Sequence, residues 1–140
     1  MQTRRDFVTW LSALSLVGLA RPLAADGPAE QKAEAAARAW LSLVDGGRYT
    51  ESWDTAAPAF KAAVTQQQWQ QALGAVRRPL GACRSRKRLS RRLVDSLPGA
   101  PPGPYVVLQF AAEFEHQPAA VETVTPALAD GWRVSGYFIK

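Results

Sequence analysis

The 140-residue chain is 47% hydrophobic and 21% charged, an ordinary globular composition that suits one compact domain. Its only cysteine, Cys83, excludes an intramolecular disulfide, so an apolar core must hold the fold together. One cysteine and one histidine fit no usual metal-ligand spacing, and the sequence contains no phosphate loop, dinucleotide fingerprint or zinc-protease motif. We therefore expect neither a metal nor a cofactor.

The first 25 residues have the three parts of an export signal. Arg4 and Arg5 precede an uncharged apolar run over residues 8–20, and small residues follow up to Ala25. The run is too short for a membrane anchor, which takes about 20 apolar residues. The stretch TRRDFV resembles a twin-arginine signal, with general secretion or a retained anchor as the alternatives. We expect cleavage after Ala25 and a periplasmic domain over residues 26–140, with no stable membrane anchor.

Helical periodicity dominates the first half of this domain. An apolar stripe with three- and four-residue spacing predicts a helix that Gly46-Gly47 ends. Two short helical segments, broken near Pro58, should follow. Thr65 and Gln68 then form a capping-box pattern at the start of another helix. The side chains expected to be buried in these helices are Ala33, Ala36, Ala37, Trp40, Leu41, Val44, Tyr49, Trp53, Phe60, Val64, Trp69, Ala72, Leu73 and Val76.

From Ala82 onward the hydrophobic period changes to two, which predicts strands. YVVLQFAAEFE should place Val106, Leu108, Phe110, Ala112 and Phe114 on one face. GWRVSGYFIK should place Trp132, Val134 and Phe138 on one face and Arg133, Tyr137 and Ile139 on the other. An edge position or a bulge is expected at Pro126. Helices followed by a four-stranded antiparallel meander predict an α+β domain with the helices packed on one sheet face. This order resembles the cone of nuclear-transport-factor-2-like and cystatin-like folds.

The stretch RRPLGACRSRKRLSRR carries eight basic residues and no acid, in a chain whose net charge is +5. Strand alternation would place Arg84, Arg86, Arg88 and Arg92 together as a candidate anion-binding face. The stretch has no aromatic residue for base stacking, so nucleic-acid binding is disfavoured. A solvated edge strand, protected by its charges from aggregation, is the main interpretation. Binding to an anionic component of the cell envelope is the alternative.

Several motifs together resemble one family. They are AWLSLVDGGRYTESWD, PLGACRSRK, LPGAPPGPYVVLQF, ETVTPAL and GWRVSGYFIK. As a joint set they are similar to the family catalogued as domain of unknown function 4019, whose members are small exported bacterial proteins. The resemblance covers nearly all of residues 30–140, and it implies a fold and a location but no reaction.

No catalytic constellation emerges from the sequence, because His116, the only histidine, belongs to a predicted turn. Candidates for a pocket or a buried ion pair are Glu122, Glu113, Tyr105, Tyr49 and Trp53. Glu122 lies in VETVT, where it must face solvent or find a partner, and an arginine of the basic strand would serve. The main interpretation is a non-catalytic domain that binds a small molecule or a protein. A pocket enzyme that uses a buried carboxylate for proton transfer, and an electrostatic binder of envelope components, are the alternatives.

Overall fold

The computed structural model describes residues 27–140, so the predicted export signal lies outside the described residues. The elements, in chain order, are α2 (Pro28–Asp45), α3 (Tyr49–Asp54), α4 (Pro58–Ala63), α5 (Gln66–Leu80), β1 (Cys83–Val94), β2 (Tyr105–Phe114), β3 (Gln117–Leu128) and β4 (Trp132–Ile139). The strands form one antiparallel sheet in the order β1-β2-β3-β4. The predicted α+β class and meander are therefore confirmed. No described helix is long and apolar enough to cross a membrane.

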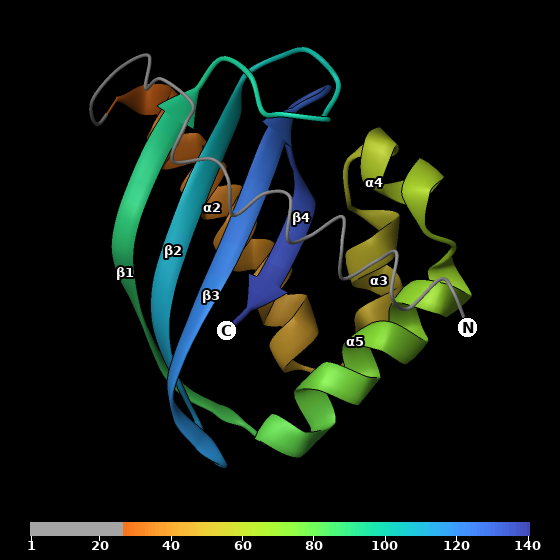
Figure 1. Ribbon diagram of the computed structural model, residues 1–140, viewed down its shortest axis with the longest axis vertical. Helices are drawn as coiled ribbons and strands as arrows, with labels where there is room; N and C mark the ends of the chain where they lie inside the picture. The colour runs from red at the N-terminus through yellow and green to blue at the C-terminus, as the bar shows by residue number, and fades with distance from the viewer. Residues whose placement is uncertain (1–26) are drawn as a thin grey trace.

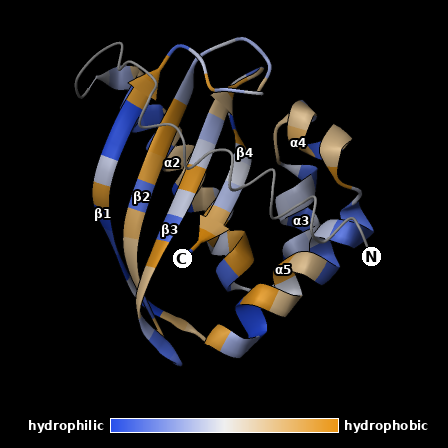
Figure 2. Cartoon of the chain, in the orientation of Figure 1, coloured by the Kyte–Doolittle hydropathy of each residue, from blue (hydrophilic) through white to orange (hydrophobic). Residues whose placement is uncertain are grey.

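Helix α2 contacts all four strands and lies along the inner face of the curved sheet, while α3, α4 and α5 lie beside β4 (Figure 1). Its apolar stripe is buried as predicted except at Ala36, which is only partly buried, and Trp40 and Leu41 lie at its centre. The inward side chains Val106, Leu108 and Phe110 of β2 are buried in the same core cluster as this stripe, while Ala112 and Phe114 form a second buried cluster near Leu80 of α5. Figure 2 shows the contrast between β2 and the more hydrophilic β1. The space between α2 and the sheet is therefore the core.

Helix α5 begins with the predicted capping box, in which the Thr65 side chain and the Gln68 side chain each bond the other residue's backbone N–H. The prediction that Val76 is buried is wrong, because its side chain is 45% exposed. The buried stripe instead follows four-residue spacing from Trp69 through Leu73 to Arg77. An arginine is therefore the last buried residue of the helix.

Strand β1 does not alternate regularly, because its register shifts between Cys83 and Ser85 and again between Arg88 and Ser90. Paired residues of neighbouring strands share a sheet face. The inward-facing Ala112, Phe110 and Leu108 of β2 pair with Arg86, Arg88 and Arg91 of β1, respectively. Arg92 pairs instead with Val107 and faces outward. The predicted common face for Arg84, Arg86, Arg88 and Arg92 is therefore wrong, because the irregularities change which side chains point inward.

A similar irregularity in the β3–β4 pairing changes which side chains of β4 face the core. Val134 pairs with Pro126 and Gly136 pairs with Thr125, so Ser135 is an extra residue in the ladder. The predicted bulge near Pro126 is confirmed. Its consequence is that Val134 and Tyr137 are both in the core, whereas regular alternation had placed them on opposite faces. That part of the strand prediction is wrong.

Candidate functional site

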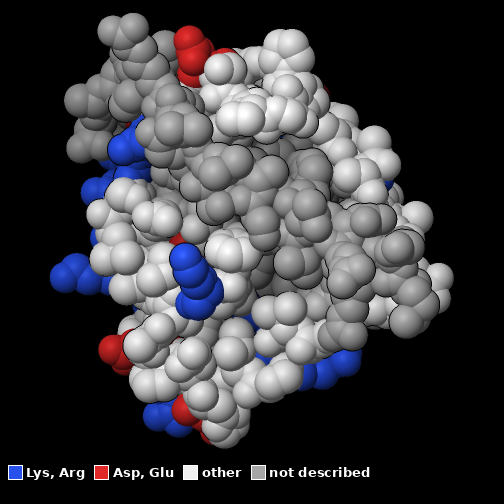
Figure 3. Space-filling model, in the orientation of Figure 1, with Lys and Arg blue, Asp and Glu red and all other residues white. Residues whose placement is uncertain are grey.

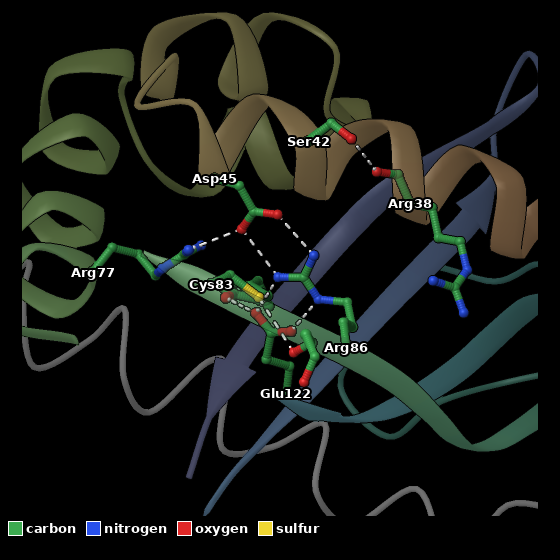
Figure 4. A network of polar contacts seen from close by, with 9 residues as sticks. Arg38, Ser42, Asp45, Arg77, Cys83, Arg86 and Glu122 are labelled. Atoms are coloured by element: carbon green, nitrogen blue, oxygen red, sulfur yellow. Dashed lines mark hydrogen bonds and ion pairs between the residues drawn. The ribbon is translucent and has the colours of Figure 1, made fainter. Parts of the chain in front are cut away.

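A network of charged side chains, buried at Glu122 and Arg77 and open to solvent at Asp45, joins the sheet to the helices (Figure 4). Glu122 of β3 is fully buried and points into the core. Arg86 reaches it from β1 across the intervening strand, and two hydrogen bonds join the guanidinium to the carboxylate, Nε to Oε1 at 2.6 Å and Nη2 to Oε2 at 3.1 Å. The hydroxyl of Tyr137 donates a third hydrogen bond to Oε2 of Glu122. This paired geometry is the strong form of an arginine–carboxylate contact.

Asp45, the last residue of α2, joins the helices to this pair. One of its oxygens accepts a bond from Nη1 of Arg86 at 2.8 Å, and the other accepts from Nη2 of Arg86 at 3.0 Å and from Nη2 of Arg77 at 2.8 Å. A carboxylate at a helix C-terminus is disfavoured by the helix dipole, and two arginines offset that cost here. The guanidinium of Arg77 also lies over the ring of Phe114, with its central carbon 4.8 Å from the ring centroid.

The network balances its charges, since two arginines face two carboxylates. Burial raises the pKa of Asp45, but hydrogen bonding and attraction from Arg86 and Arg77 outweigh burial and hold that pKa below its ordinary value of 3.8. Burial lowers the pKa of Arg86, and its bonds to Asp45 and Glu122 outweigh this effect and raise it. Burial, followed by the nearby charge of Glu122, raises the pKa of Tyr137 well above its ordinary value. These shifts favour an ionised Asp45, a protonated Arg86 and a neutral Tyr137, the states in which their hydrogen bonds form.

The other residues predicted to form a pocket or an ion pair lie apart from this network. Glu113 is exposed, on the face of β2 opposite the core. The Tyr105 hydroxyl donates to the backbone oxygen of Pro101 at 2.5 Å. The indole N–H of Trp53 donates to the backbone oxygen of Val64 at 2.8 Å, and Tyr49 is half-buried at the start of α3. None of the four bonds to Glu122 in the described residues.

Three network members were missed by sequence reasoning: Asp45, Arg77 and Tyr137. An acid directly before Gly46-Gly47, at a helix C-terminus, is a signal that could have drawn attention to Asp45. The four-residue continuation from Trp69 and Leu73 could have identified Arg77 as inward-facing.

The candidate anion-binding arginines are divided by the fold. Arg86 is bonded within the network, and Arg88 bonds to Glu34 of α2 at 2.8 Å, as Arg91 does at 2.7 Å. The Arg84 side chain is 67% exposed, with Glu115 4.0 Å away, and Arg92 is also exposed. Basic side chains are visible along the β1 edge in Figure 3, but three of the four predicted residues, Arg84, Arg86 and Arg88, already have carboxylate partners.

Two hollows are among those that open on the described surface. One, with a volume of about 470 Å³, lies between α2 and β4 and is lined by Ala36, Ala39, Leu43 and Trp132 among others. A second, of about 190 Å³, lies between the start of α4, the loop before β2 and the β3–β4 turn, with Tyr105 in its wall. Both are mainly apolar. Among residues 27–140, no group of three or more His, Cys, Asp and Glu side chains is arranged to hold a metal ion.

A family model described as "Protein of unknown function (DUF4019)" matches residues 36–137. The chain belongs to this family. All five network residues of the DUF4019 domain lie within the matched segment, and Tyr137 is its final residue. No curated protein and no solved structure matches the chain. The family assignment therefore agrees with the resemblance in the sequence and adds no reaction.

The stability of the DUF4019 domain should depend on pH at both extremes. Folding lowers the pKa of Asp45, so its contribution to the unfolding free energy is present above its unfolded value of 3.8 and is lost as the pH falls through the lower folded value. Folding raises the pKa of Tyr137, so its contribution is complete below its unfolded value of 10.0 and is lost as the pH rises toward the folded value. Urea unfolding across this range should show a plateau with a decline on each side.

Two variants test which residue causes each decline in the unfolding free energy. Asp45→Asn should make the acid decline shallower, and Tyr137→Phe should make the alkaline decline shallower. An alkaline decline of the same steepness in Tyr137→Phe would contradict the assignment.

Proposed function

We propose that the DUF4019 domain works in the periplasm as a non-catalytic binding domain. The observation that carries this proposal is the state of Glu122, the fully buried carboxylate among the predicted candidates. One of its oxygens is bonded to Arg86, and the other is bonded to both Arg86 and Tyr137. A general base must have a lone pair within reach of a substrate proton. In this arrangement three of the about four lone-pair sites of the carboxylate already accept hydrogen bonds that hold β1, β3 and β4 together.

The positions of the candidate carboxylates also argue against the alternative of an enzyme that uses one of them for proton transfer. Glu113, the other candidate carboxylate, is exposed on the face of β2 opposite the core, so burial does not favour its neutral form. The two hollows on the described surface, by contrast, are concave and mainly apolar, as small-molecule sites usually are. The export signal in the sequence supports a periplasmic location.

The proposal is tested with the full chain, expressed with its native leader and purified from the periplasm under gentle conditions. Native mass spectrometry should show a retained ligand or partner in addition to the bare domain. The same protein, unfolded in denaturant, dialysed and refolded, is the control and should show the bare mass alone. A bare mass from both preparations would contradict the binding function, and recovery of the chain in the cytoplasm would contradict the location.

A further inference from the structure

The larger hollow exists because α2 presents small side chains opposite β4. Ala36 and Ala39 end at Cβ, so the helix cannot fill the space between itself and Trp132. Trp40, which is buried in the core, contributes to the floor. The volume of about 470 Å³ falls within the range of small-molecule sites, which is about 300–1,000 Å³.

Two opposite charges line this apolar hollow. Arg133 of β4 is partly buried, and Asp130 is in the β3–β4 turn with a positive φ of 56°. Within residues 27–140 no hydrogen bond or ion pair engages either side chain, in contrast with the paired arginines of β1. A few polar groups in an apolar site usually fix the orientation of a ligand. A guanidinium is well suited to a carboxylate, and a carboxylate to an ammonium group.

We propose that this hollow binds a small zwitterion with an apolar body, of the chemical class of hydrophobic α-amino acids. The ligand's carboxylate pairs with Arg133 and its ammonium group with Asp130, while its side chain packs against Ala36, Ala39 and Trp132. This inference rests on the proposed binding function and names a site and a ligand class for it.

The test uses L-phenylalanine as the probe and the two-dimensional ¹H–¹⁵N NMR spectrum of the domain as the readout. Titration to millimolar concentration should shift the signals of Ala36, Ala39 and the Trp132 indole. Phenylethylamine, which lacks the carboxylate, and 3-phenylpropionate, which lacks the ammonium group, should each bind about tenfold more weakly or worse. Equal binding of all three compounds, or no shifts around the hollow, would overturn the proposal.

Substitutions in the hollow test the position of the site independently of the ligand analogues. Arg133→Gln should weaken L-phenylalanine binding by about tenfold or more, whereas the matched change Arg92→Gln, on the outward face of β1, should leave it unchanged. Ala39→Leu fills the hollow from the exposed side of α2 and should abolish binding while the far-ultraviolet circular dichroism spectrum stays the same. Undiminished binding in Arg133→Gln or Ala39→Leu would overturn the proposal.

The native mass measurement separates this inference from the broader function. A ligand retained from the periplasm by the parent protein and lost by Ala39→Leu supports both. If Ala39→Leu retains the ligand equally well, the hollow is not the binding site. The proposed binding function would still hold in that case.

Discussion

Glu122→Leu should lower the free energy of unfolding by about 3–5 kcal/mol, the usual effect of removing one partner from a buried ion pair. The substitution removes the carboxylate that accepts bonds from Arg86 and from the Tyr137 hydroxyl. Arg86 keeps Asp45, but its Nε loses its partner in a place where only 12% of the side chain is exposed. Urea unfolding followed by circular dichroism at neutral pH measures the change.

The matched control is Glu113→Leu, which makes the same replacement on the exposed face of the neighbouring strand. Surface changes of this kind usually alter stability by about 0.5 kcal/mol or less. If Glu122→Leu were no more destabilising than Glu113→Leu, the network would contribute nothing to the fold.

A double variant separates the effect of removing the whole Arg86–Glu122 ion pair from the effect of removing only one of its charges. In Arg86→Met with Glu122→Leu, neither charge remains to be buried without its partner, and Asp45 keeps Arg77. We therefore expect the double variant to be less destabilised than the sum of the two single variants, with a coupling of about 0.5–3 kcal/mol. Strict additivity would show that the two side chains act independently.

Trp69→Ala should also lower the free energy of unfolding by about 3–5 kcal/mol, because it leaves a large cavity in the core. The Trp69 ring is fully buried, and its centroid lies 4.8 Å from that of Phe60 and 6.0 Å from that of Trp40. Its indole N–H donates to the Ser52 hydroxyl at 2.9 Å. This residue therefore connects α5 to α3, α4 and α2.

Two further substitutions show how much of the loss in stability comes from ring volume, from the hydrogen bond to Ser52 and from burial. Trp69→Phe keeps most of the ring volume and should cost less than Trp69→Ala, the remaining loss reflecting the missing bond to Ser52. Trp132→Ala removes an indole that is only partly buried, so it should be less destabilising. The interpretation would be contradicted if Trp132→Ala and Trp69→Ala had equal effects in denaturant unfolding.

Local patterns were sufficient to predict most of the fold. The capping box at Thr65, the inward stripe of α2 and the alternation of β2 each depend on residues a few positions apart. Such short-range periodicity reports directly on which face of an element is buried. The class, the order of the elements and most of the core could therefore be predicted.

The buried network could be predicted only in part, because its assembly depends on where the strand ladders slip. Glu122 stood out in the sequence as a carboxylate among β-branched residues. Tyr137 faces it only because Ser135 is inserted into the β3–β4 pairing. Outside the network, the irregularity near Leu89 likewise turns Arg91 inward, toward Glu34. A slip of one residue exchanges the two faces of a strand, and composition does not reveal its position.

The network also has a consequence for how the chain folds during synthesis. Arg86 lies 41 residues after Asp45 and 36 residues before Glu122, and Tyr137 arrives 15 residues later still. When α2 leaves the ribosome, Asp45 has neither of its arginines, and a chain that stops before β4 lacks Val134 and Tyr137 from its core. Contacts between such distant residues form only after a long loop has closed. The domain therefore completes its core only when β4 has emerged.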